Sequence, residues 1–170
     1  MSKGEIILEL NSLLDYASLF FLQYVPNGLT YILAGYALAG KTINRREYLS
    51  SSMILAVAGF TAKIFSQVKL EGTGNSLPQI LIIFACIFLL IYRNKISPMY
   101  AILSSLIAML LQLIFEVVYM VLFLQKMLNV DMNLIFNQPN IMFSFIGFPY
   151  LLAFGLLVLL IYKRRTKRRV

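Results

Sequence analysis

The sequence predicts an all-α membrane protein, a bundle of about five transmembrane helices with the N-terminus outside and the C-terminus in the cytoplasm. Hydrophobic residues make up 60% of its 170 residues and charged residues 13%, whereas a soluble domain has about 45–50% and about 25%. The hydrophobic residues form runs of roughly 16 to 25 residues, the length that crosses a bilayer core of about 30 Å. Most basic residues lie at alternate ends of these runs, which sets a direction for the chain.

The first predicted span covers residues 19–39 and stops at the basic residues Lys41, Arg45 and Arg46. Ahead of it, residues 1–16 mix leucine and isoleucine with acidic residues in a loosely helical pattern. This pattern predicts an amphipathic segment, which forms either an interfacial helix or an outward extension of the first span.

The second predicted span covers residues 48–66, and a polar, glycine-containing loop follows it at residues 67–76. The third span, residues 77–92, is short and apolar on all sides, so we expect it at the periphery of the bundle. It ends at the polar run 93–95.

The fourth predicted span, residues 98–124, is long enough to tilt in the bilayer. An asparagine-rich loop follows at residues 125–140, and then the fifth span at residues 141–162. A single five-helix domain over residues 17–163 therefore accounts for nearly the whole chain, with a basic cytoplasmic tail at residues 164–170.

The orientation follows from the basic residues. With the N-terminus outside, eleven Lys and Arg residues lie at the cytoplasmic boundaries, and only Lys3, Lys69 and Lys126 lie outside. Six of the fifteen basic residues directly follow the last span, starting at Lys163. A cluster in that position is typical of a topogenic anchor that also meets anionic lipid headgroups. The net charge of +8 is therefore assigned to the membrane, and we expect no nucleic-acid partner.

Three spans carry small or polar residues at helical spacing. Such faces pack helices together in lipid, because small residues allow close approach and polar groups bond across the contact. The faces comprise Gln23, Asn27, Thr30, Ala34 and Ala37 on the first span, Ser52, Ala56, Gly59, Lys63 and Gln67 on the second, and Ser105, Met109, Gln112, Glu116 and Tyr119 on the fourth.

Lys63 and Glu116 are the two charges within the spans. They lie about 24 Å and about 28 Å of helix from the cytoplasmic ends of their spans, so they reach similar depths near the outer leaflet. Two interpretations stay open. In one, they line an outward-opening polar pocket with Gln112, Gln23 and Asn27, where a ligand is recognised. In the other, Lys63 snorkels to the interface and Glu116 bonds a neighbouring helix.

The residue inventory argues against an enzyme. The chain has no histidine, which excludes histidine-dependent nucleophiles, histidine metal ligands and a phosphoacceptor histidine. Glu116 is the only acid within a span, so a paired-carboxylate mechanism lacks its second member. The single cysteine, Cys86, lies in an apolar segment, and no glycine-rich phosphate-binding motif is present. We expect no catalytic activity, no cofactor and no metal.

Several short motifs are shared with a known class of membrane region. They are GYALAGK at residues 35–41, Lys63, Ile114-Phe115-Glu116, Gln138-Pro139, Gly147-Phe148-Pro149 and Leu160-Ile161-Tyr162-Lys163. Over about residues 26–165 the chain resembles the N-terminal membrane-spanning sensor region of bacterial, Firmicutes-type GHKL sensor histidine kinases. The resemblance implies a protein of the bacterial cytoplasmic membrane that detects an extracellular or membrane signal.

Only seven residues follow Lys163, so the resemblance does not imply a kinase. We expect a stand-alone sensor-like domain, an accessory to a separate cytoplasmic or membrane signalling partner, or a fragment of a longer protein. Its predicted function is to recognise a ligand, lipid or partner helix near the outer leaflet. A membrane subunit of a transporter and a structural partner in a larger complex are the alternatives, and homo-oligomerisation stays open.

Overall fold

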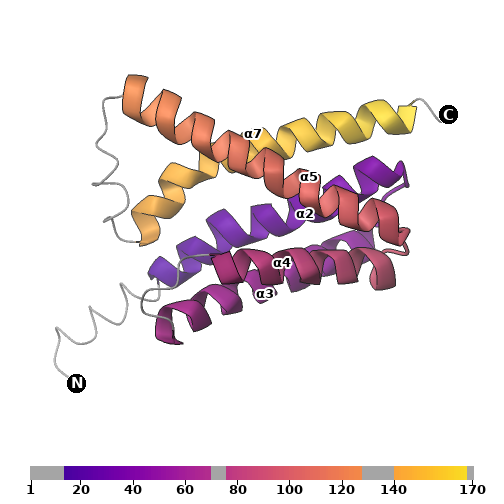
Figure 1. The fold of residues 1–170 in the computed structure, drawn as a ribbon, viewed down its shortest axis with the longest axis horizontal. Coiled ribbons are helices and arrows are strands. Elements are labelled where there is room, and N and C mark those ends of the chain that lie inside the picture. Colours follow the sequence, from indigo (N-terminus) through magenta and orange to yellow (C-terminus); the bar gives the residue numbers. More distant parts are fainter. Residues whose placement is uncertain (1–13, 70–75, 128–139, 168–170) are drawn as a thin grey trace.

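The computed structural model describes residues 14–69, 76–127 and 140–167, and these residues are helical apart from two short turns. Figure 1 shows the helices lying along a common direction, with α5 and α7 crossing each other. The elements, with η marking a π-helical segment, are η1 (Phe20–Tyr24), α2 (Val25–Ala39), α3 (Arg45–Lys69), α4 (Ser76–Phe88), η2 (Leu89–Arg93), α5 (Pro98–Val117), η3 (Val118–Met127) and α7 (Asn140–Lys167). The all-α prediction is confirmed for this part of the chain.

Each π-helical segment continues a neighbouring α-helix, so the described residues form five rods that correspond to the five predicted spans. Three helices are long and apolar enough to cross a membrane, namely Arg45–Phe65, Pro98–Val117 and Phe145–Lys167. A further helix, Ile80–Arg93, is apolar but shorter. These three helices support membrane association. That the first and third predicted spans also cross the membrane stays a prediction.

The helices extend further than the sequence patterns indicate. The first rod is already helical at residue 14, and α7 runs to Lys167 through residues expected to form a separate tail. Basic side chains at a helix C-terminus favour such an extension, because they interact well with the unpaired carbonyl groups there. Predictions for residues 1–13, 70–75, 128–139 and 168–170 lie outside the described residues.

Helix α2 forms the centre of the bundle and contacts α3, α5 and α7. Every residue from Thr30 to Ala37 is buried, so this segment is enclosed on all sides. Ile32 and Tyr36 are completely buried, as is Phe154 of α7 in the same core cluster. A helix that is apolar all round fits such a central position.

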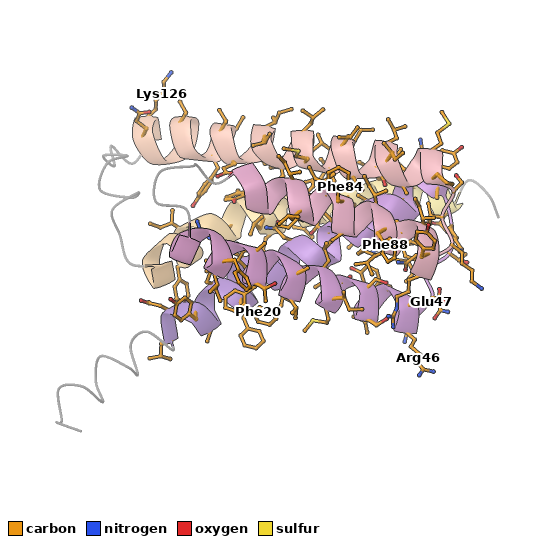
Figure 2. All side chains as sticks on the ribbon, turned by 60° about the horizontal axis from the view of Figure 1, so that its bottom comes forward. Phe20, Arg46, Glu47, Phe84, Phe88 and Lys126 are labelled. Carbon is orange, nitrogen blue, oxygen red and sulfur yellow. The ribbon has the colours of Figure 1, made fainter. Side chains whose placement is uncertain are left out.

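The outer surface of the bundle is apolar along its length and charged at its ends. Figure 2 shows Lys126 at one end, Arg46 and Glu47 at the other, and phenylalanine side chains such as Phe84 between them. Phe84 is 67% exposed and Phe65 is 66% exposed. Exposed apolar surface of this extent marks a membrane-facing or partner-facing region.

Helix α4 packs against α3 and α5 and presents two different sides. Cys86 and Leu90 are completely buried, whereas Phe84 and Phe88 are exposed. One side of α4 therefore packs against its neighbours and the other is exposed, as expected for a helix at the periphery of the bundle.

Two turns close the bundle at the end where the C-terminus of α7 also lies (Figure 1). Helix α2 stops at Gly40, whose φ of 60° is left-handed and readily adopted only by glycine. The turn between η2 and α5 contains Lys95, which also has a positive φ. Five of the eight described basic residues outside α7 lie in these turns or directly beside them, namely Lys41, Arg45, Arg46, Arg93 and Lys95.

Candidate functional site

The predicted polar face of the first rod, formed by η1 and α2, points toward α7. A Cβ atom at Gly147 would lie 3.4 Å from the amide nitrogen of Gln23, and one at Gly155 would lie 3.2 Å from the Thr30 hydroxyl. Thr30 is buried, and its hydroxyl donates a 2.8 Å hydrogen bond to the Pro26 carbonyl. Small residues on α7 thus allow the polar side chains of α2 to approach its backbone closely.

The polar face of α3 is a packing face against the first rod. Gly28 of α2 lies so close to α3 that a Cβ atom there would overlap with the carbonyl oxygen of Ser52 and lie 3.3 Å from the Ala56 nitrogen. One turn further, a Cβ atom at Gly59 would lie 2.9 Å from the Tyr24 ring, so glycine allows this close approach. This face brings two backbones together and leaves little space for a ligand.

The polar face of α5 divides into two halves. Its inner half packs in the core, where Ser105 is completely buried and its hydroxyl donates to the Ala101 carbonyl at 2.9 Å and to the Cys86 sulfur at 3.4 Å. Its outer half meets α7, where the Gln112 and Tyr150 side chains form a hydrogen bond. The outer half therefore contributes to a polar contact between helices.

Glu116 lies in this outer half and acts electrostatically on two tyrosines, Tyr31 of α2 and Tyr150 of α7. Both tyrosines are buried, with exposed fractions of 6% and 8%. The ring of Tyr119 also meets that of Tyr150, with centroids 6.0 Å apart. Polar side chains of three helices that are distant in sequence thus lie within electrostatic range of one another.

We call the polar side chains between the first rod, α5 and α7 the Glu116 cluster. Its members are Gln23, Asn27, Tyr31, Gln112, Glu116, Tyr119 and Tyr150. Asn27 belongs to it because it lies one helical turn from both Gln23 and Tyr31. The Oδ1 atom of Asn27 is buried and has no hydrogen-bond partner.

All three helices are irregular beside the cluster. The first rod changes from π to α at Val25, and the fourth changes from α to π at Val118, two residues after Glu116. Helix α7 contains Pro149, which removes one backbone hydrogen bond next to Tyr150. π-helical segments and broken helices recur at functional sites of membrane proteins. Here they coincide with the polar side chains.

Four of the five predicted site residues belong to the Glu116 cluster, and the fifth, Lys63, lies on α3. Lys63 lies one turn beyond Gly59, whose neighbours are Tyr24 and Ile82. Glu116 instead has Tyr31 and Tyr150 as its electrostatic neighbours. Pairing between Lys63 and Glu116 therefore stays a prediction, as does a shared site of Glu116 and Gln112 beside Tyr150.

A second polar group lies at the end of the bundle that contains the two turns. The sequence patterns did not predict it. Asn94 is completely buried; its oxygen accepts from the Tyr36 hydroxyl at 2.8 Å, and its amide donates to the Ser51 hydroxyl at 2.9 Å and the Leu89 carbonyl at 2.9 Å. The Lys41 ammonium donates to the Asn94 carbonyl at 2.6 Å. Every side-chain group of Asn94 is thus satisfied, which indicates a structural role.

The chemistry available at the Glu116 cluster is recognition through hydrogen bonds and charge. It offers a carboxylate, an amide oxygen without a partner and tyrosine hydroxyls. Within residues 14–69, 76–127 and 140–167, no group of three or more Cys, Asp or Glu residues is placed to hold a metal ion.

No family model, curated protein or solved structure matches this chain.

Proposed function

We propose that the chain is a multi-pass protein of the bacterial cytoplasmic membrane, with five spans, the N-terminus outside and the C-terminus in the cytoplasm. Two features support this. The exposed sides of the helices are apolar between charged ends (Figure 2). Basic residues gather at the end formed by the turns and the C-terminal part of α7, which the positive-inside rule assigns to the cytoplasm.

Within that membrane, we infer that the chain is a non-catalytic, sensor-like module that recognises a ligand at the Glu116 cluster. The observation that carries this proposal is the Oδ1 atom of Asn27, which is buried without a hydrogen-bond partner one helical turn from Tyr31. A buried acceptor without a partner costs about 1–3 kcal/mol, and a bound donor would recover that cost. The resemblance to sensor regions of GHKL kinases agrees with this proposal, and it implies a separate signalling partner.

A transporter subunit is the second candidate, because the irregular helices beside the cluster resemble the broken helices that bind substrates in transporters. A structural partner of a larger complex is the third. Such a protein would use its exposed apolar sides and would not need an unpaired acceptor in its interior.

The test is to purify the chain from its native membrane and analyse what accompanies it by native mass spectrometry. We expect a small molecule or lipid bound in stoichiometric amount, which Glu116→Gln and Asn27→Leu each release. Thr61→Val is the control, because the Thr61 hydroxyl bonds only to carbonyls of its own helix. Release of a bound protein without any small molecule would favour the structural candidate and overturn the ligand-binding proposal.

A sensor and a transporter subunit differ in the next step. A sensor loses signalling to its partner in the Glu116→Gln variant while the protein still inserts and accumulates. A transporter subunit instead moves the bound solute once its energising partner is supplied in the same vesicles. If a ligand is bound but the protein shows neither signalling nor transport, the sensor proposal has no support.

A further inference from the structure

We propose that the basic end of the bundle binds one anionic phospholipid beside the turn between α2 and α3. Arg45, Arg46 and Lys163 hold the lipid phosphate, and the exposed apolar sides of α3 and α7 carry the acyl chains. The site is separate from the Glu116 cluster and is independent of any ligand there.

Basic residues of α3 and α7 come together at this turn. The hydroxyl of Tyr162 on α7 accepts a 3.2 Å hydrogen bond from the backbone amide of Ile43. Ile43 lies two residues before Arg45, and Lys163 directly follows Tyr162. The bond therefore brings the first turn of α3 close to the last turns of α7. The exposed basic residues at this place are Arg45, Arg46, Lys163 and Arg164.

The positive charge of this end is not balanced within residues 14–69, 76–127 and 140–167. Nine basic residues lie in or beside the two turns and in the last turns of α7, and Glu47 is the one acid among them. Lys41 and Arg165 donate hydrogen bonds to main-chain carbonyls at 2.6 Å and 2.7 Å, which leaves their charges without a counter-charge. Arg45 and Arg46 begin α3, where the helix dipole is positive as well. An anion is thus the group that complements this end.

Both helices carry an exposed apolar stripe that continues from the basic residues along the outside of the bundle. On α3 the stripe follows Arg46 at spacings of three and four residues, which places it on one face. On α7 a stripe of the same kind ends three residues before Lys163. The stripes comprise Leu49, Met53 and Val57 on α3 and Leu152, Leu156 and Leu160 on α7, all between 42% and 60% exposed.

The two stripes belong to helices on either side of α2, which contacts both (Figure 1). On α7, the ring of Phe154 meets that of Phe115 on α5, with centroids 6.0 Å apart. Leu156 lies two residues further, about 200° around the helix, so its stripe is turned away from α5. A phospholipid with its phosphate at the shared basic end therefore finds apolar surface for its acyl chains on α3 and α7.

A phospholipid complements this surface better than an acidic protein segment does. The cations lie at the ends of surfaces that stay apolar for several helical turns, and a phospholipid presents a phosphate followed by apolar chains. An acidic protein segment would complement the charged part alone. A zwitterionic lipid carries its own cationic group, which the basic residues repel.

The experiment titrates the full chain in detergent micelles with dioleoyl phosphatidylglycerol and counts bound lipids by native mass spectrometry. Dioleoyl phosphatidylcholine has the same acyl chains without the net charge. We expect one phosphatidylglycerol to bind about 10-fold or more tightly than phosphatidylcholine. Glycerol 3-phosphate tests the headgroup without acyl chains and should not displace the lipid. A polyglutamate peptide tests an acidic protein segment and should bind more weakly than phosphatidylglycerol.

Two double variants remove the same number of charges from the same end of the bundle. Arg46→Gln combined with Lys163→Gln should weaken phosphatidylglycerol binding by about 30-fold, equivalent to about 2 kcal/mol for two basic residues. Arg93→Gln combined with Lys95→Gln is the matched control, because these residues lie at the other turn, between η2 and α5. The control should change the affinity by less than about 3-fold, because solvent and salt screen exposed charges away from the site.

Each outcome decides one point. Equal weakening by the two double variants would show a diffuse effect of charge and overturn the site. Equal binding of both lipids to the wild type would overturn the preference for an anion. Displacement by glycerol 3-phosphate would leave a free phosphate as the ligand, and tighter binding of polyglutamate would assign the surface to an acidic protein; either result overturns the proposal. The titrations of the wild type decide these points even if a variant fails to fold.

Discussion

The hydroxyl of Tyr36 donates a 2.8 Å hydrogen bond to the side-chain oxygen of Asn94, which lies 58 residues further along the chain, and both residues are completely buried. This bond ties the end of α2 to the turn between η2 and α5. Ser51 of α3 bonds to the other side of the same amide. One asparagine therefore joins three of the five rods at the end that we assign to the cytoplasm.

Asn94→Leu should strongly destabilise the protein. The substitution leaves the Tyr36 and Ser51 hydroxyls without the Asn94 side chain in a buried region, at a cost of about 2–4 kcal/mol in the free energy of unfolding, whereas the Leu89 carbonyl keeps its bond from the backbone amide of residue 94. Asn44→Leu is the control, because Asn44 is exposed and its side chain accepts only from the Arg46 amide. Reversible unfolding in mixed micelles measures both, and equal stability of the two variants would refute a structural role for Asn94.

Gly28→Ala should also destabilise the bundle, because its Cβ would overlap with the Ser52 carbonyl oxygen and force α2 and α3 apart. We expect a loss of about 2 kcal/mol or more, as for other overpacked interiors. Gly147→Ala is the matched comparison, because its Cβ would meet its neighbours at an ordinary 3.4 Å. That variant should be neutral or slightly more stable, since alanine favours a helix over glycine by about 1 kcal/mol. The reverse order of the two melting temperatures would contradict the close α2–α3 contact.

Lys63→Glu and Glu116→Lys test the charge pair that the sequence predicts. If the two side chains pair, reversal of both charges should recover folding that either single reversal loses. A double-mutant cycle should then give a coupling energy above about 0.5 kcal/mol, because residues in contact do not act additively. Additive losses of stability in the doubly reversed protein would refute the pair.

Arg165→Gln should lower stability by about 0.5–1 kcal/mol, because the Arg165 guanidinium donates a 2.7 Å hydrogen bond to the Leu38 carbonyl in the last turn of α2. Arg164→Gln removes the same charge from the next residue of α7, which is exposed. Thermal unfolding of the two variants isolates the hydrogen bond from the charge. Indistinguishable melting temperatures would show that the bond makes no contribution.

The sequence predicted the helical class and the places of the five rods, because runs of apolar residues broken by charges are a strong local signal. It also placed Gln112 and Glu116 together, since their spacing puts them on one helical face. The relative positions of helices are set by packing between distant residues, and no local pattern contains them. The depth argument for Lys63 and Glu116 used helix lengths alone and did not include the tight contact of Gly28 with Ser52, which fixes how α3 lies against α2.

The buried tyrosines and Asn94 were missed for a related reason. Tyrosine and asparagine near the ends of apolar segments are typical of membrane interfaces, so Tyr36 and Asn94 gave no sign of a mutual bond. Tyr150 directly follows Pro149, which lies inside α7. This helix-breaking proline is the sequence feature that could have indicated a functional position at Tyr150.

The most direct test is a cysteine-accessibility map in intact cells, in a Cys86→Ser background that keeps a hydrogen-bonding group beside Ser105. Single cysteines replace the exposed Lys126, Lys95 and Lys167, and a fourth replaces Glu116; position 94 is avoided because Asn94 is buried. We predict that a membrane-impermeant maleimide labels positions 126 and 116 and leaves 95 and 167 unlabelled until the cells are opened. Labelling of 95 or 167 in intact cells would contradict the orientation, and protection of 116 beside a labelled 126 would contradict a ligand site that opens outward.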